Sequence, residues 1–103
     1  MAKESNTYRR IKAVEIATRV LEYLSTKKNM ATLTDVSTAL ELPAATVMCH
    51  LETLKDRGFV TEINGAYTLG MKVAMLWARI KANLEGKIRE MESQVKTLEG
   101  PNG

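Results

Sequence analysis

The stretch LELPAATVMCHLETLKDRGFV, residues 40–60, decides the fold that this sequence predicts. Pro43 marks a break, because the residue before a proline avoids helical backbone angles and proline itself suits the first position of a new helix. After it, Leu51 and Leu54 recur at helical spacing, and Gly58 is a typical C-terminal stop. The stretch therefore predicts a tight turn and then a helix that ends just before Gly58.

Two helices are expected before this turn. Apolar residues recur at steps of three and four between Ala13 and Leu24, which gives the first helix one apolar stripe. In TLTD, residues 32–35, Thr32 can cap the free amides of a second, short helix, and Asp35 stands three residues later as in a capping box. The expected buried positions of that helix are Val36, Ala39 and Leu40.

The residues after Gly58 have the pattern of a β-hairpin. Residues 59–63 and 66–69 are strand-like, and the dipeptide Asn64-Gly65 between them favours a tight two-residue turn. The expected order is helix, helix, turn, helix, hairpin. This is the layout of a winged helix-turn-helix.

A long helix is expected from Met71 to about Leu98, because this segment has no proline and only one interior glycine, Gly86. Its main apolar residues are spaced 4, 3, 4, 4, 3, 4 and 3, which is a heptad seam with one extra four-residue step. We expect this seam to pair with a second copy of the chain. The residues of the seam are Val73, Trp77, Ile80, Leu84, Ile88, Met91, Val95 and Leu98.

The expected fold class is therefore mainly α with a small β-hairpin. We expect a flexible basic arm at residues 1–10, a winged helix-turn-helix at residues 11–70, a long dimerisation helix at residues 71–98, and a disordered tail at residues 99–103. A chain of 103 residues is one small domain with at most an appendage.

Composition limits the classes of protein that this sequence fits. A net charge of +3 permits a polyanionic partner without requiring one. The single cysteine rules out an internal disulfide framework, and the polar N-terminus lacks the apolar run of a signal peptide. The longest apolar run, residues 73–78, is too short to span a membrane. We expect a soluble cytoplasmic protein with no membrane partner.

The sequence TLTDVSTALELPAATVMCHLETLKDRGFVTEINGAYTLG resembles the N-terminal DNA-binding module of the IclR family of bacterial and archaeal regulators. The shared features are VLEYL, LELP, Thr46-Val47, LETL, RGFV and YTLG, and the resemblance covers roughly residues 13–73. It implies a regulator of transcription that binds double-stranded DNA. Family members usually continue into a large ligand-binding domain, whereas this sequence stops after one helix, so we expect no small-molecule effector domain.

The helix after Pro43 would be the reading helix, whose N-terminal part enters the major groove. In the resembled family this helix usually carries basic residues at positions that here hold Ala44 and Cys49. Small side chains allow close approach to the bases, and Thr46 can bond a base edge or a phosphate. The residues expected to face DNA are Ala44, Ala45, Thr46, Met48, Cys49 and His50.

Charge for binding DNA must then come mainly from other segments. Residues 43–70 hold two basic side chains, Lys55 and Arg57, against three acidic ones. Phosphate contacts supply affinity and base contacts supply specificity, so different segments can provide them. The further expected DNA contacts are Arg9, Arg10, Lys12, Thr32, Lys55, Asn64 and Lys72. Two alternatives stay open: the arm is either a solvated tail or a minor-groove reader, and Lys27-Lys28 is either a solvated loop or a phosphate contact.

No enzyme is expected. Cys49 and His50 are the only cysteine and histidine, and neighbours on a helix point about 100° apart, so they cannot converge on one metal or act as a nucleophile and its base. No phosphate-binding glycine loop is visible, and no cofactor or metal is expected. The rival function is an adaptor that binds proteins, which the uncharged reading helix favours. A regulatory protein that controls the chain is a further expected partner.

Overall fold

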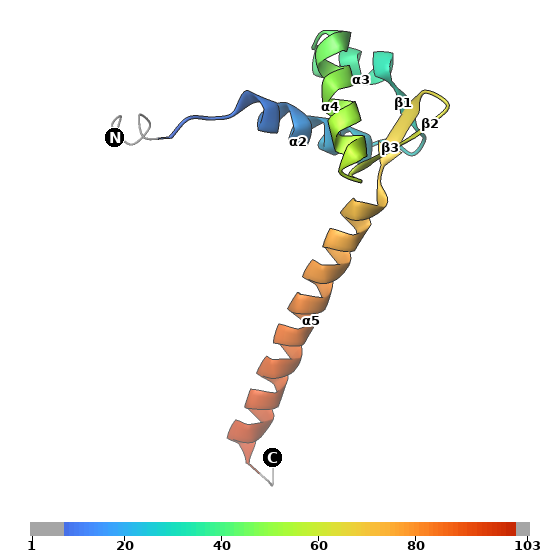
Figure 1. Cartoon of the computed structure of the whole chain (residues 1–103). Coiled ribbons are helices and arrows are strands. Elements are labelled where there is room, and N and C mark those ends of the chain that lie inside the picture. Colours follow the sequence, from blue (N-terminus) through green and yellow to red (C-terminus); the bar gives the residue numbers. More distant parts are fainter. Residues whose placement is uncertain (1–7, 101–103) are drawn as a thin grey trace. The chain divides into compact units, whose positions relative to one another are not determined.

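The computed structural model describes residues 8–100, and the chain divides into two compact units, one up to Lys72 and one from Val73. The first unit contains three helices and a three-stranded antiparallel sheet in the order β1-β3-β2 (Figure 1). The helices are α2 (Lys12–Ser25), α3 (Leu33–Leu40) and α4 (Ala44–Asp56), and the strands are β1 (Ala31–Thr32), β2 (Val60–Ile63) and β3 (Ala66–Leu69). The predicted winged helix-turn-helix is confirmed.

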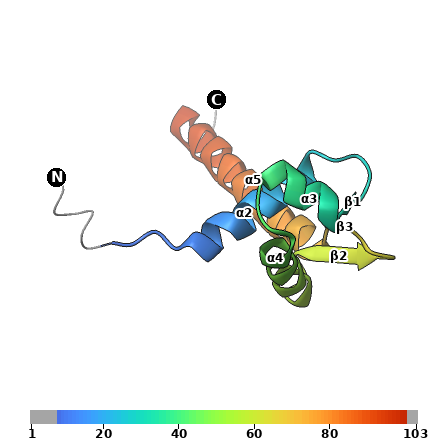
Figure 2. The same ribbon diagram turned by 90° about the horizontal axis from the view of Figure 1, so that it is seen from above.

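One small core holds this unit together. Every helix and strand contributes to it, and α2 packs against both α3 and α4 (Figures 1 and 2). Leu51, Val20, Val36 and Val47 are its largest fully buried side chains. Ala39, expected to be buried in α3, is exposed instead, because Val36 and Leu40 already occupy the core side of that short helix. The core is therefore complete within the first unit.

The turn between α3 and α4 is fixed by hydrogen bonds to its backbone. Glu41 adopts a left-handed conformation, with a φ of 56°, which ends α3 although most residues other than glycine avoid that region. The Arg19 guanidinium of α2 donates to the carbonyl oxygen of Leu40 at 3.0 Å, and the Ser37 hydroxyl donates to that of Leu42 at 2.6 Å. These bonds hold α4 at a set angle to α2 and α3.

The hairpin of β2 and β3 turns at Asn64-Gly65, as predicted, with both residues at positive φ. The third strand, β1, was not expected from the sequence. It is only two residues long and pairs Ala31 with Tyr67 and Thr32 with Ala66. This short edge links the segment before α3 to the hairpin, so the start of α3 and the wing are joined by backbone bonds.

Gly70 connects β3 to the next helix at a point where only glycine fits. Its amide donates to the carbonyl oxygen of Phe59 at 2.8 Å, and the amide of Lys72 donates to that of Gly58 at 3.1 Å. A Cβ atom at Gly70 would collide with the Gly58 carbonyl oxygen, a backbone atom that cannot move aside cheaply. Gly70 and Lys72, at the end of the first unit, are therefore bonded to the loop between α4 and β2.

The predicted long helix is present as α5 (Met71–Glu99), which includes Glu99 from the segment expected to be a disordered tail. None of the 29 residues of α5, all of them described, is buried. The seam residues Trp77, Leu84 and Ile88 are 58%, 52% and 54% exposed. Residues 1–7 of the expected arm and 101–103 of the expected tail lie outside the described residues.

Across residues 8–100, none of the helices combines the length and the apolar character that a membrane span requires.

Candidate nucleic-acid interface

The N-terminus of α4 is the part of the helix-turn-helix best suited to meet an anion. Pro43 precedes the helix with a φ of −59° and a ψ of 143°, so it is the capping residue. The sequence had suggested instead that Pro43 is the first helical residue. Within the described chain, no side chain caps this end, and its first turn has no carboxylate. The free amides and the positive end of the helix dipole are therefore available to a phosphate.

The N-terminus of α3 is closed by comparison. The amide of Asp35 donates to the Thr32 hydroxyl oxygen at 3.1 Å, and the amide of Thr32 donates to the Asp35 carboxylate at 3.0 Å. These bonds from Thr32 hold the pKa of Asp35 below its ordinary value. Thr32 was expected to contact DNA, and the structure gives its hydroxyl oxygen this capping role.

Side chains in the first half of α4 divide between the surface and the core. Val47 is buried, whereas Ala44, Ala45 and Cys49 are exposed. His50 is half-buried, and its Nδ1 lies 2.8 Å from the carbonyl oxygen of Thr46. Because a carbonyl only accepts hydrogen bonds, Nδ1 carries the proton in this contact, and Nε2 is the nitrogen left for another partner.

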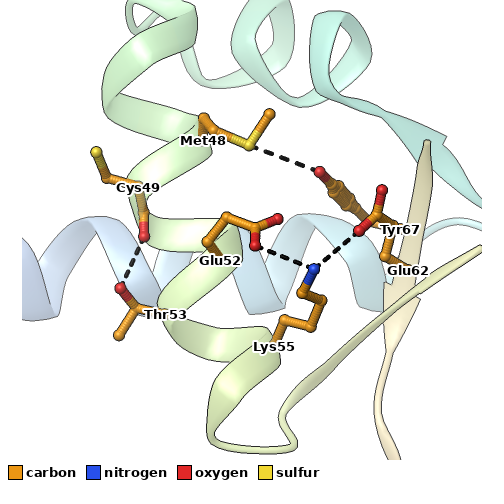
Figure 3. Close-up of polar contacts among 7 residues, drawn as sticks. All are labelled: Met48, Cys49, Glu52, Thr53, Lys55, Glu62 and Tyr67. Carbon is orange, nitrogen blue, oxygen red and sulfur yellow. Dashed lines mark hydrogen bonds and ion pairs between the residues drawn. The ribbon is translucent and has the colours of Figure 1, made fainter.

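Thr46, also half-buried, and Met48, at the edge of exposure, complete the predicted contact set on α4. The Tyr67 hydroxyl of β3 donates to the Met48 sulfur at 3.7 Å (Figure 3). Tyr67 is buried, and burial raises the pKa of its phenol. Met48 is therefore held toward the hairpin, and Ala45 and Cys49 are left as the outward side chains of these turns.

The second half of α4 carries an ion-pair cluster, the Glu52–Lys55–Glu62 clasp (Figure 3). The Lys55 ammonium donates to Glu62 of β2 at 2.9 Å and lies 3.0 Å from the carboxylate of Glu52. These two carboxylates raise the pKa of Lys55, with the bond to Glu62 as the larger cause. Lys55, expected to contact phosphate, is already paired with two carboxylates, and the clasp has a net charge of −1.

The basic residues outside α4 are arranged differently. Arg9 and Arg10 are exposed just before α2, and Lys12 lies 3.6 Å from Glu15 in the first turn of that helix. Lys72 lies over the ring of Phe59, 5.9 Å from its centroid. The Lys27 ammonium lies 5.5 Å from the centroid of the Tyr23 ring, and the two alternatives for Lys27-Lys28, a solvated loop or a phosphate contact, both stay open.

Asn64, expected to contact DNA from the wing, is exposed at the tip of the hairpin with a φ of 51°. Left-handed angles are common for asparagine in such turns, and its side chain is directed by the turn and not by packing. The tip is therefore free to meet a partner.

The residues that neutralise Lys55 and those that fix the turn between α3 and α4 were not expected from the sequence. Glu52 could have been found, because it precedes Lys55 by three residues on one helix. Glu62 and Arg19 could not, since their contacts join separate elements and depend on the packing of the fold. Within residues 8–100 no group of three or more potential metal ligands comes together.

Comparisons with known proteins agree with this geometry. Residues 13–63 match the family model of the IclR helix-turn-helix domain. The chain is similar to an IclR transcriptional regulator from Alicyclobacillus acidocaldarius, with 32% identity and a TM-score of 0.67 over 70% of this chain and 30% of that one. A search of curated proteins found no match.

Two other solved structures are also similar. A protein assigned as an IclR transcriptional regulator in Silicibacter sp. is 28% identical, with a TM-score of 0.64 over 69% of this chain and 28% of that one. HmgR of Pseudomonas aeruginosa, at 21% identity and a TM-score of 0.62 over 67% of this chain and 29% of that one, shares the fold. The chain thus spans less than a third of the length of these relatives. Its winged helix is an IclR helix-turn-helix domain.

Proposed function

We propose that this chain is a sequence-specific DNA-binding regulator of transcription that acts in the cytoplasm as a homodimer. The observation that carries the proposal is the N-terminus of α4, which is uncapped among the described residues and is followed by the small exposed side chains Ala44 and Ala45. In the helix-turn-helix, this is the end that approaches the bases. The IclR domain match supports the same use of α4.

Specificity would come from contacts of α4 with base edges. Ala45 can touch a thymine methyl group, and Cys49, exposed one turn later, extends the same face. A phosphate bound at the free amides would fix the register of the helix on the duplex. The clasp brings no free cation to this face, so we propose that affinity depends on basic residues outside α4.

Pairing of two chains would supply the rest of the affinity. The α5 seam is half-buried at Val73 and exposed from Trp77 to Leu98, and a heptad stripe of this kind is covered most simply by an identical helix. Two reading helices could then meet two half-sites on one face of the duplex. A bound dimer would regulate by occupying its site, with a regulatory protein as a further partner.

A titration against random and genomic DNA fragments at two salt concentrations tests the proposal. Replacing Arg9 and Arg10 with Ala should weaken binding to all sequences and flatten the salt slope by about one unit for each lost phosphate contact. The matched control replaces Arg89 and Lys96 with Ala, which removes the same charge from α5 outside its seam. If the arm variant binds like the parent at every salt concentration, the arm takes no part.

The second candidate function is a protein-binding adaptor, and one observation favours it. Glu52 and Asp56 share an outward face of α4 with Cys49, so carboxylates occupy part of the surface that DNA would approach. The same titration separates the two functions. An adaptor would show no binding to any fragment even at low salt, where phosphate contacts are strongest.

A further inference from the structure

The C-terminal half of α5 follows the heptad pattern without interruption. From Ile88 the seam continues to Met91, Val95 and Leu98 in steps of three, four and three residues. In heptad notation the first and third of these residues hold position a, and the other two hold position d. Isoleucine or valine at a with leucine at d favours two strands in a parallel coiled coil, and methionine, like leucine, is not branched at Cβ. This half of the seam therefore has a composition suited to a parallel pair.

The same stretch of the seam carries a hollow that a partner side chain can enter. It is open to solvent and is lined by Ile88, Met91, Glu92 and Val95. These four residues hold positions a, d, e and a, and in a coiled coil each seam residue inserts into a hole formed by four residues of the facing helix. In a parallel pair aligned in register, the side chain opposite this hollow is the same methionine of the second copy. Methionine suits that role because its side chain adapts to irregular spaces.

Two charged residues flank the hollow on opposite sides of the seam. Lys87 directly precedes Ile88 and therefore holds position g, and Glu92, directly after Met91, holds position e. Both charged side chains are exposed, and among residues 8–100 neither takes part in an ion pair. Unlike Lys55 in the clasp, they are free to meet a partner helix.

The orientation of a second α5 decides which charges meet. In a parallel, in-register pair, position g of one helix faces position e of the next heptad on the other, so Lys87 of each chain meets Glu92 of its partner. Turning one helix over exchanges the flank that it presents, so an antiparallel pair sets g against g and e against e. With the seams fully overlapped, that arrangement brings the two copies of Lys87 together near the middle of the pair.

An antiparallel pair also offers Glu92 a poorer partner. The basic residue that comes opposite it in the overlapped seams is Lys81, which already lies 3.7 Å from Glu85 of its own helix. The parallel pair thus satisfies two free charges in each chain and brings no like charges together across the seam. The charges and the seam composition favour the same arrangement.

We propose that the α5 helices of two chains pair in parallel and in register, with Lys87 of each chain bound to Glu92 of the other. The inference rests on the homodimer proposed above and names the residues that select its arrangement. The occupant of the seam is a second copy, because the hollow and both free charges fit this same sequence on the facing helix. Each winged helix precedes its α5 in the chain, so a parallel pair would keep both DNA-binding units at one end.

Charge reversal tests this proposal on the full chain. Lys87→Glu or Glu92→Lys alone replaces two ion pairs with two like-charge contacts. Either variant should weaken self-association at low salt by about tenfold, since each exposed contact is worth a factor of up to about five. Combining the two substitutions restores opposite charges across the pair and should recover most of the lost affinity between chains. Sedimentation equilibrium measures the dissociation constant of each dimer.

A matched control reverses two neighbouring charges that point away from the seam, at Arg89 and Glu90. Arg89→Glu or Glu90→Lys should change the dissociation constant by less than about twofold. An antiparallel pair predicts another pattern. There Lys87→Glu only replaces one like-charge contact with another and has little effect, and the double variant stays as weak as Glu92→Lys. That pattern would overturn the parallel arrangement.

A disulfide reads the orientation without relying on charge. In a Cys49→Ser background, Leu98→Cys places the only thiol on the seam near the end of α5. In a parallel pair two such thiols face each other, so most of the protein should run as a covalent dimer on a non-reducing gel after diamide treatment. Diamide takes up the two electrons and two protons that the thiols release. In an antiparallel pair the thiols lie about 35–40 Å apart, at 1.5 Å per residue, and cannot join.

Ser93→Cys in the same background is the control for this cross-link. It lies opposite the seam and should give no covalent dimer. Equal cross-linking of both variants would overturn the proposal, because thiols that face away from the seam cannot meet within the pair.

Sedimentation of the parent chain separates the two levels of the proposal. If the parent is a dimer but Leu98→Cys does not cross-link, the parallel arrangement fails and the proposed homodimer stands. If the parent sediments as a monomer at micromolar concentration, both fail. A dimer that shows the charge rescue and the seam cross-link supports both.

Discussion

The winged helix and α5 are both regular structures, but they differ in whether their apolar side chains are buried within the same chain. The winged helix buries Leu51 completely within its own chain. Leu84 of α5, the same residue type in an equally regular helix, is 52% exposed. A buried leucine stabilises the fold that surrounds it, whereas an exposed one on a seam stabilises only what comes to cover it. The winged helix therefore carries the stability of the chain by itself, and we expect the exposed residues of α5 to serve the proposed assembly.

The largest expected effect is on the free energy of unfolding, and it tests the difference between the winged helix and α5 directly. Leu51→Ala should lower the free energy of unfolding by about 2–5 kcal/mol, because it leaves a cavity in a small core. The matched change Leu84→Ala, in a chain dilute enough to be monomeric, should alter it little, since alanine is an excellent helix former. Urea unfolding followed by circular dichroism measures both. Equal losses would mean that α5 packs against the winged helix in the monomer.

The next effect concerns assembly. Ile88→Asp places a charge in the α5 seam and should convert the proposed dimer into a monomer with greatly reduced DNA affinity, while the melting temperature of the dilute protein stays the same. Ser93→Asp adds the same carboxylate to the opposite face and should leave the dimer intact. Sedimentation at micromolar concentration distinguishes them. A parent chain that binds DNA tightly as a monomer would disprove the pairing mechanism.

A smaller effect is expected at the start of α3. Thr32→Ala removes the hydroxyl that caps the helix and should cost about 1 kcal/mol of unfolding free energy. The capping box also sets a pH dependence. The pKa of Asp35 is lowered from 3.8, so its stabilising contribution is complete above that pH and is lost as the pH falls through the lowered value. Asp35→Asn should abolish this part of the acid dependence in unfolding curves.

The smallest expected effect is on DNA affinity, and it concerns the Glu52–Lys55–Glu62 clasp of the winged helix. Glu62→Gln removes one partner of Lys55 and one negative charge from the clasp. DNA binding at low salt should become tighter, and the salt slope should steepen by up to about one unit if Lys55 gains a phosphate contact. Glu85→Gln, which breaks the exposed pair with Lys81 in α5, is the control and should leave affinity unchanged. Unaltered affinity in both variants would place the clasp outside the DNA interface.

Elements with strong local signals could be predicted from the sequence. The capping box, the Asn64-Gly65 turn and the long uninterrupted helix each depend on residues close together in the chain, and all three are present. The strand β1 was missed because two residues carry no periodicity, and its pairing with Tyr67 depends on a segment 36 residues away. Residues close together in the chain therefore predicted the helices and the hairpin better than the long-range contacts that connect them.

The candidate site was harder to predict for the same reason. The exposed positions Ala45 and Cys49 follow from helical spacing, but the partial burial of Thr46 and His50 depends on how the other elements pack against α4. Lys55 looks like a free cation in the sequence, and only the fold brings Glu62 to it. Charge counted along a chain does not reveal which charges are already paired.

Trp77, the only tryptophan, is 58% exposed in the seam of α5, whereas the tyrosines Tyr8, Tyr23 and Tyr67 all precede α5. The two segments therefore carry different natural chromophores. Tryptophan emission should shift toward shorter wavelength when the seam is covered, and unfolding of the winged helix should be followed through the tyrosines. A dilution series on the unlabelled protein can thus report pairing and folding as two separate optical signals.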